Sequence, residues 1–242
     1  MTDFTSLPDN LPVPTADGAA DHLTRRLMPT LVLTATDGAS VDLGARGPGR
    51  TIVYLYPQTG RPGVDLPEGW DDIPGARGCS TEACDFRNHF DELRESGAAR
   101  VFVSSQSVAY QSELVARLRL PFAMVSDETL ALAELLNLPT FVALGEIRLY
   151  SRLTLIVLEN SIEHVFYPIS PPEYPRPPGA RMAEEQSSSS LTEGHSRQSK
   201  TGLRCSGDLL LATAPAILLN LGSANPQRGG TRRGALLRDA HL

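Results

Sequence analysis

The hydrophobic positions of this chain predict strands that alternate with helices up to about residue 172. Continuous apolar runs at Thr51–Tyr56 and Val101–Ser104 are typical of buried strands, and the first indicates a central one. Thr30–Ala35 and Ser40–Leu43 flank an Asp-Gly pair, which predicts a hairpin. Three further strands are expected, at Phe122–Val125, Leu149–Leu158 and Ile162–Phe166.

The segments between these strands carry a helical period. The longest predicted helix, Ser80–Ser96, stops at Gly97. The other three are Ala16–Arg26, Val108–Arg119 and Glu128–Leu136, the last capped by Asp127. Strands that alternate with helices and end in a hairpin predict an α/β fold of the thioredoxin type, with a central mixed sheet flanked by helices.

The composition changes after Pro172 and divides the chain into three parts. Residues 1–27 are expected to form an N-terminal arm that contains the first short helix, and residues 28–173 the folded domain. Residues 174–242 begin with closely spaced prolines, continue through the Ser187–Ser190 run and end rich in Gly and Arg. Such a segment buries too little surface to offset chain entropy, so a largely disordered tail is expected.

Charge and cysteine content narrow the class of function. The 28 acidic and 22 basic residues give a net charge of −6, and no basic patch indicates a nucleic-acid partner. No apolar run reaches the roughly 18–20 residues that a membrane span needs. Three cysteines do not make a secreted disulfide framework, so a reducing, cytoplasmic setting is expected.

Two of those cysteines, Cys79 and Cys84, lie five residues apart at the start of the longest predicted helix. Cys79 starts an inward-facing stripe at the first turn, where the helix N-terminus favours a thiolate. Cys84 lies about 140° round the helix and is expected to face away from that stripe. Residues five apart on a helix have Cα atoms roughly 8–9 Å apart, which is too far for a disulfide, so the two can bond only if the first turns unwind. This predicts Cys79 as nucleophile and Cys84 as its resolving partner.

Simpler interpretations of the same pair remain open. Two small buried hydrophobic side chains would also fit these positions. A zinc site needs a further Cys or His pair at short spacing, which this segment does not offer, so no metal is expected.

The motif Gly78-Cys79-Ser80-Thr81-Glu82-Ala83-Cys84-Asp85-Phe86-Arg87, after the strand that ends in Tyr56-Pro57, resembles the peroxiredoxins, and most of all their Q-type (bacterioferritin-comigratory-protein) branch. Two later segments, Leu120–Asp127 and Ser151–Val157, fit the same family, and the resemblance runs from about Met28 to Pro172. It implies the thioredoxin fold and a thiol-dependent peroxidase that uses a hydroperoxide and a thioredoxin-like reductant, without metal or organic cofactor.

The resemblance also implies roles for single residues. Cys79 would be the peroxidatic cysteine, Cys84 the resolving cysteine, and Arg152 the guanidinium that stabilises the thiolate and polarises the peroxide. The family's loop is Pro-x-x-x-Thr-x-x-Cys, whereas here Pro57 lies 22 residues before Cys79 and Ala76 occupies the threonine position. The loop Gln58–Gly78, with the sole tryptophan Trp70, is therefore interpreted as an insertion. Pro57 and one hydroxyl from Thr59, Ser80 or Thr81 are the candidates for substrate contact.

Two other functions fit the same residues. A thiol–disulfide oxidoreductase or redox sensor would keep both cysteines but reduce peroxide slowly. A non-catalytic interaction module would recruit a partner through the tail or the arm. The sequence does not distinguish a monomer from a homodimer, and it does not identify the hydroperoxide or the reductant.

Overall fold

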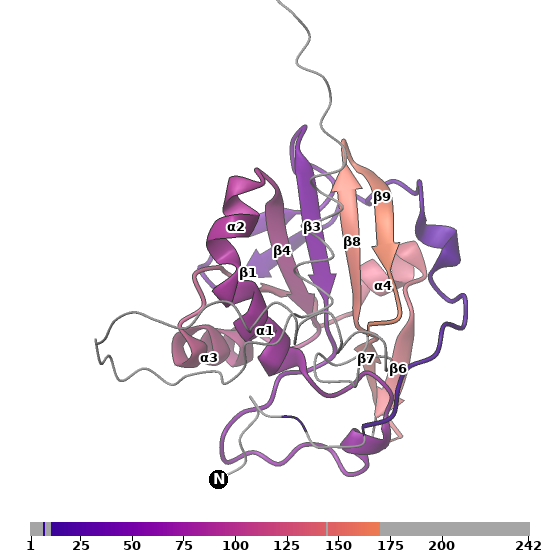
Figure 1. Cartoon of the computed structure of the whole chain (residues 1–242), viewed down its shortest axis with the longest axis vertical. Coiled ribbons are helices and arrows are strands. Elements are labelled where there is room, and N and C mark those ends of the chain that lie inside the picture. Colours follow the sequence, from indigo (N-terminus) through magenta and orange to yellow (C-terminus); the bar gives the residue numbers. More distant parts are fainter. Residues whose placement is uncertain (1–6, 8–10, 144, 170–242) are drawn as a thin grey trace, which may run out of the picture.

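The architecture is a seven-stranded mixed sheet with helices on both faces (Figure 1). The computed structural model describes residues 7, 11–143 and 145–169, so the predicted tail, 174–242, lies outside the described residues. The strand order is β2-β1-β5-β4-β3-β8-β9. The strands are β1 Val32–Ala35, β2 Ser40–Asp42, β3 Arg50–Leu55, β4 Ala99–Ser104, β5 Val125–Ser126, β8 Leu153–Leu158 and β9 Ser161–Phe166. This arrangement is the thioredoxin-like fold that the sequence predicts.

Strand β3 lies between β4 and β8, as its continuous apolar sequence predicts. It pairs parallel with β4 and antiparallel with β8, and five of its six residues are buried. The predicted hairpin around Asp37-Gly38 is also confirmed, since β1 and β2 pair antiparallel through Thr34 and Ser40.

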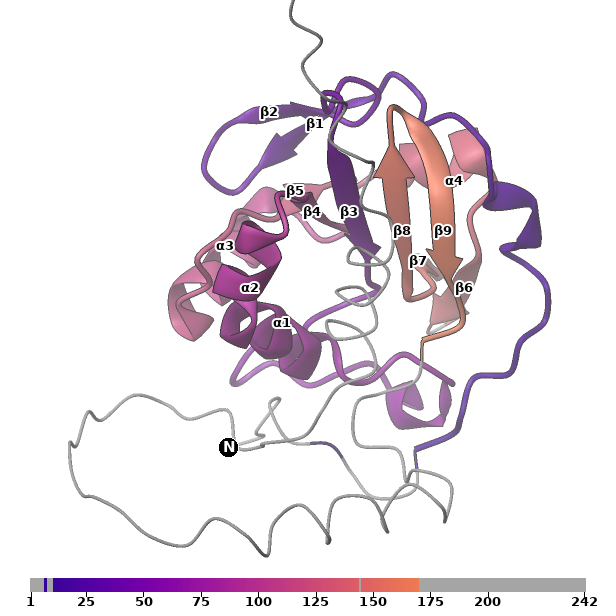
Figure 2. The same ribbon diagram turned by 45° about the horizontal axis from the view of Figure 1, so that its top comes forward.

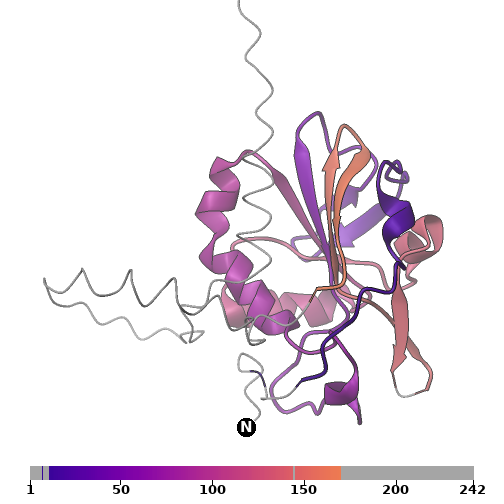
Figure 3. The same ribbon diagram turned by 45° about the vertical axis from the view of Figure 1, so that its right-hand side comes forward.

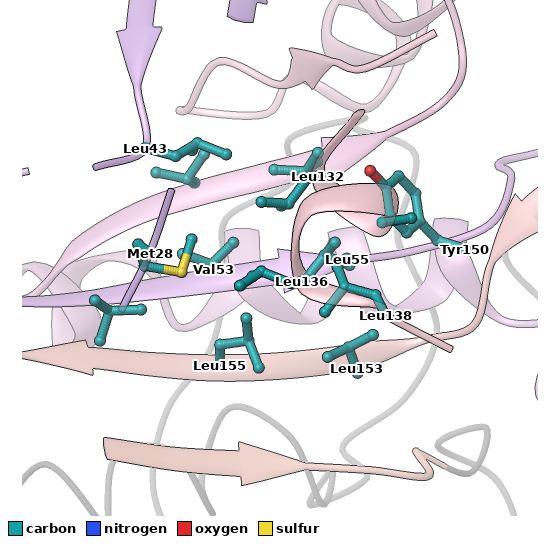
Figure 4. Close-up of a cluster of buried hydrophobic side chains, with 14 of the residues drawn as sticks. Met28, Leu43, Val53, Leu55, Leu132, Leu136, Leu138, Tyr150, Leu153 and Leu155 are labelled. Carbon is teal, nitrogen blue, oxygen red and sulfur yellow. The ribbon is translucent and has the colours of Figure 1, made fainter. Parts of the chain in front are cut away.

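Successive side chains of the central strands point into two separate cores. Val53, Leu55 and Leu155 pack with Leu132 and Leu136 of helix α4 (Ala131–Leu136), as Figure 4 shows. Tyr54, Phe102 and Ile156 belong to the other core, with residues of helices α1 (Cys79–Asn88) and α3 (Val108–Leu118). In Figure 3 the two helical layers lie on opposite sides of the sheet.

The N-terminal segment packs against the second hairpin of the sheet. Only Asp21–Leu23 is helical, as a 3-10 turn labelled η1, so the longer helix predicted over Ala16–Arg26 is wrong. The Arg25 N–H donates to Ile162 O at 2.8 Å. These backbone bonds to β9 replace the helical ones, and Leu23 is fully buried in the core.

The long predicted helix Ser80–Ser96 is two helices, α1 and α2 (Phe90–Glu95). His89 separates them because its backbone, with φ −99° and ψ 15°, leaves the helical region. The helix predicted over Glu128–Leu136 begins later, at Ala131, because Leu130 adopts φ +56°. Asp127 still caps it, accepting hydrogen bonds from the N–H groups of Ala131 and Leu132 at 2.9 Å.

The single strand predicted over Leu149–Leu158 is also wrong. Strand β7 (Ile147–Tyr150) pairs with β6 (Thr140–Ala143) in a separate ribbon, and the chain enters the main sheet only at Leu153. Ser151 and Arg152 form the corner between the two sheets. The strand predicted over Phe122–Val125 is shorter, with only Val125–Ser126 paired, to β1 and β4.

The loop Gln58–Gly78 is anchored on this β6–β7 ribbon. Trp70, in the 3-10 turn η2 (Trp70–Asp72), is 2% exposed and packs with Ala143 and Leu149. Its ring centroid lies 6.0 Å from that of Phe141. The loop is therefore held as part of the fold, and its far end delivers the chain to Cys79.

Candidate active site around Cys79

Cys79 is the first residue of helix α1, as the sequence predicts. Gly78 precedes it with φ +106°, a backbone conformation that favours glycine. The Cys79 side chain is 3% exposed and is a free thiol. Its sulfur lies 3.6 Å from the carbonyl oxygen of Ala76, which belongs to the last turn of the loop that Trp70 anchors. The loop and the helix together hold the sulfur at a helix N-terminus, where positive potential favours a thiolate.

Arg152 reaches the same sulfur from the corner between the two sheets. Its Nη2 donates to Cys79 Sγ at 3.3 Å and to the carbonyl oxygen of Arg77. The side chain is buried, and its Nη1 has no acceptor among the described residues. A guanidinium at this distance stabilises negative charge on sulfur. Cys79 and Arg152 are 73 residues apart in the sequence, and the fold brings them together.

Glu82 completes a buried charge network that sequence reasoning missed. Its Oε2 lies 3.1 Å from Arg152 Nε, and both side chains are 1% exposed. The Tyr54 hydroxyl donates to the same carboxylate oxygen. Position 82 is three residues after Cys79, on the same side of the helix, so this spacing was the available signal. A carboxylate beside the arginine fixes the orientation of the guanidinium relative to the sulfur.

The network sets the charge states of its members. Burial by itself lowers the pKa of Arg152, but Cys79, Glu82 and Tyr54 outweigh burial, and the pKa is raised overall. Burial, reinforced by Glu82, raises the pKa of Tyr54 well above its ordinary value. Burial and the neighbouring Cys79 do the same for the pKa of Tyr56. Arg152 is therefore a permanent cation and both tyrosines stay neutral donors at physiological pH.

A narrow pocket opens beside the sulfur. Its volume is about 10 Å³, which is roughly the space that one water needs. Its lining includes Gln58, Trp70, Arg77, Cys79 and Ser80. Ser80 is 3% exposed, and its hydroxyl has no hydrogen-bond partner among the described residues. A wider cleft of about 370 Å³ shares Leu66, Trp70 and Arg77 with this pocket.

The other predicted contact residues lie at different distances from this pocket. Pro57 is buried two residues after the end of β3, and its carbonyl oxygen accepts from Ser104 Oγ at 3.1 Å. The Thr59 hydroxyl donates to Gln106 Oε1 at 3.0 Å, and the Thr59 carbonyl accepts from Tyr110. Neither Pro57 nor Thr59 lines the pocket, and neither does Thr81, which is half-buried on α1.

Cys84 is buried as well, although it lies about 140° round the helix from Cys79. It is 1% exposed and belongs to the same cluster of buried side chains as Cys79. Helix α1 packs against α3 as well as the sheet, with Arg87 Nη1 donating to Leu118 O at 2.7 Å. More of its circumference is therefore buried than an amphipathic stripe predicts. Cys84 is engaged in a disulfide that does not involve Cys79.

The described residues contain no cluster of three or more His, Cys, Asp or Glu side chains that could hold a metal ion. Within the same part of the chain, no helix is long and apolar enough to cross a membrane.

Comparisons with known proteins place the site in context. Residues 22–182, more than half of the chain, match the redoxin family. The chain is similar to the chloroplastic peroxiredoxin Q of Oryza sativa subsp. japonica, at 29% identity over 100 residues, 41% of this chain and 39% of that protein. It is also similar to the chloroplastic peroxiredoxin Q of Gentiana triflora, at 26% identity over 128 residues, 51% of this chain and 52% of that protein. The chain thus spans about two fifths to one half of the length of these curated relatives.

Among solved structures, the peroxidoxin BcpB of Mycobacterium tuberculosis matches with a TM-score of 0.48 and 22% identity, over 59% of this chain and 84% of that one.

Proposed function

Because the chain belongs to the redoxin family, we propose that it is a thiol-dependent peroxidase that reduces hydrogen peroxide or organic hydroperoxides. The observation that carries this proposal is the contact between Arg152 Nη2 and Cys79 Sγ, 3.3 Å long and buried beside a small pocket. A buried cysteine with a purely structural role does not require a buried arginine in contact with its sulfur. The peroxiredoxin Q relatives support the same activity.

In the first step the Cys79 thiolate attacks one oxygen of the hydroperoxide. The S–O bond forms as the O–O bond breaks, which oxidises Cys79 to a sulfenic acid and releases an alkoxide that takes up a proton as the alcohol, or water from hydrogen peroxide. Arg152 Nη1, which lacks an acceptor among the described residues, supports this step by offering a donor to the oxygen that gains charge. Arg152 Nη2 holds the attacking sulfur.

In this proposal the peroxide binds in the pocket that Ser80 and Cys79 line. The Ser80 hydroxyl is buried without a partner among the described residues, so it is our candidate for the hydrogen bond that positions the substrate. The Thr59 hydroxyl is already engaged with Gln106, which makes it the weaker candidate, and Thr81 and Pro57 lie outside the lining. The pocket has room for roughly one water, so the loop Gln58–Gly78 must move before a peroxide can enter from the wider cleft.

In the second step the reduced Cys84 thiolate attacks the sulfenic acid of Cys79. The S–S bond forms, the S–O bond breaks, and the oxygen leaves as water. Residues five apart on an intact helix are roughly 8–9 Å apart at Cα, so the first turns of α1 must unwind for this step. A thioredoxin-like dithiol then reduces the disulfide and restores both thiols. We place the protein in the cytoplasm as a monomer or homodimer, with no metal or organic cofactor in the cycle.

The test is consumption of peroxide coupled to NADPH oxidation by thioredoxin and its reductase, starting from fully reduced protein. Cys79→Ser should abolish turnover. Cys84→Ser should form a sulfenic acid that a dimedone probe traps, without steady turnover. Equal rates for wild type and Cys79→Ser would overturn the proposal. Disulfide exchange without rapid peroxide reduction would instead identify a thiol–disulfide oxidoreductase or redox sensor.

A further inference from the structure

A second pocket lies apart from Cys79, where the β1–β2 hairpin meets strands β4 and β5. Its volume is about 270 Å³, and none of its lining residues lines the pocket at Cys79. In Figure 2 the hairpin lies at the opposite end of the molecule from the loop that carries η2. The size is suited to one small organic molecule. The peroxidase proposal assigns no role to this pocket.

Two arginines line this pocket from different parts of the chain. Arg46 comes from the segment between β2 and β3, and Arg100 from β4. Arg46 Nε and Arg100 Nη1 are both shielded from solvent and have no hydrogen-bond acceptor among the described residues. Neither guanidinium forms a salt bridge within that part of the chain. Shielded donors on charged groups are costly without an acceptor, so the pocket favours an anion.

The remaining walls are apolar and partly aromatic. Arg100 Cζ lies 4.8 Å from the centroid of the Phe90 ring, which fixes the guanidinium against an aromatic face. The Phe90 and Phe122 rings are 6.1 Å apart at 29°, and both line the pocket together with Val41 and Val125. A ligand that fills this space therefore needs a flat apolar body as well as its charge.

The nearby charges do not already neutralise the arginines. Asp37 also lines the pocket, but its Oδ1 accepts from the Ala39 N–H at 3.0 Å within the hairpin turn. Burial lowers the pKa of Arg100, and the neighbouring Arg94 lowers it further. A bound anion would reverse both effects, since it would restore an acceptor and a negative charge beside the guanidinium.

We propose that this pocket is a binding site for a small organic anion, a carboxylate carried on a planar apolar group, held by Arg46 and Arg100 against Phe90 and Phe122. The carboxylate accepts from the two guanidinium groups, and the planar group packs on the aromatic wall. The inference rests on this pocket alone and is independent of the chemistry at Cys79.

The test is a titration of the full-length protein with benzoate, monitored by calorimetry and by the amide chemical shifts in two-dimensional NMR. Benzyl alcohol has the same ring without the charge, and inorganic phosphate has charge without the ring. Arg100→Gln and Arg46→Gln remove one donor each. Arg94→Gln is the matched control, because it removes the same charge from a 63% exposed side chain that does not line the pocket. Circular dichroism and thermal unfolding establish that each variant is folded.

Saturable benzoate binding is expected, with shifts confined to the β1–β2 hairpin and residues near 100 and 121–125. Each pocket variant should weaken it tenfold or more, while Arg94→Gln should change it less than twofold. Benzyl alcohol and phosphate should both bind at least tenfold more weakly than benzoate. No saturable binding at 10 mM benzoate would overturn the proposal. So would equal loss in Arg94→Gln, or phosphate binding as tight as that of benzoate, because either would reduce the site to non-specific charge attraction.

Discussion

Replacing Arg152 by methionine separates the structural part of the buried charge network from its chemical part. The variant removes the cation that lies 3.1 Å from Glu82 and leaves that carboxylate 1% exposed without its arginine. Breaking a buried ion pair by removing one partner costs about 3–5 kcal/mol. This is a large share of the roughly 5–15 kcal/mol that stabilises a typical domain. With a urea m-value of about 2 kcal/mol per molar, the midpoint should fall by roughly 2 M.

The double variant Arg152→Met/Glu82→Gln makes the prediction specific. Both charges are now absent, so no buried carboxylate is left without its partner, and most of the lost stability should return. Peroxidase activity should not return, because no guanidinium then contacts Cys79. A network that served only the fold would instead recover both properties together.

The assay uses the sole tryptophan as its probe. Trp70 is 2% exposed in the loop that reaches Cys79, so its fluorescence reports unfolding in urea near the site. Arg94→Met is the control: it replaces an exposed arginine of α2 and should change the midpoint of urea unfolding little. The reasoning is refuted if Arg152→Met costs less than about 1 kcal/mol, or if the double variant is as unstable as the single one.

Three further predictions concern other parts of the fold. Asp127→Ala removes the cap of α4 and the acceptor of the Tyr150 hydroxyl. The free energy of unfolding, measured in urea, should fall by about 2–4 kcal/mol. Asp127→Asn keeps one acceptor oxygen, so it should lose less stability than Asp127→Ala. Arg50 donates to Glu163 at 2.7 and 2.9 Å and holds the pKa of that carboxyl below its ordinary value. The pair therefore stabilises the fold at pH values above the pKa of this carboxyl in the unfolded chain. This contribution is lost as the pH falls through the lower pKa of the folded state. Glu163→Gln should lower the free energy of unfolding by at most about 1 kcal/mol at pH 7, and should not change it near pH 2. Trp70→Ala removes the anchor of the loop, so it should lower stability by about 3–5 kcal/mol and speed alkylation of Cys79 by iodoacetamide; unchanged alkylation would show that the loop does not limit access.

The local parts of the fold followed from short-range pattern. The apolar run Thr51–Tyr56 predicted a central strand, the Asp37-Gly38 pair predicted the hairpin, and Gly78-Cys79 marked the start of a helix, because each depends on residues close together in the chain. Where tertiary contacts decide, prediction failed. His89 divides one helix into two, and Ser151–Arg152 turn one apolar segment into a corner between two sheets. Periodicity shows no difference between a continuous strand and two strands that pair with different partners.

For the site, the sequence by itself determined which sulfur begins a helix and which residue types surround it in the chain. The family resemblance implied that Arg152 acts on the Cys79 sulfur, and in the tertiary structure its Nη2 lies 3.3 Å from that sulfur. Only the tertiary structure decided that Glu82 and Tyr54 orient Arg152, and that Cys84 lies in the same buried cluster as Cys79. The physical reason is that charge stabilisation and burial depend on distances across the sheet and between helices. Those distances are fixed when strands far apart in the sequence pair, and no local pattern records them.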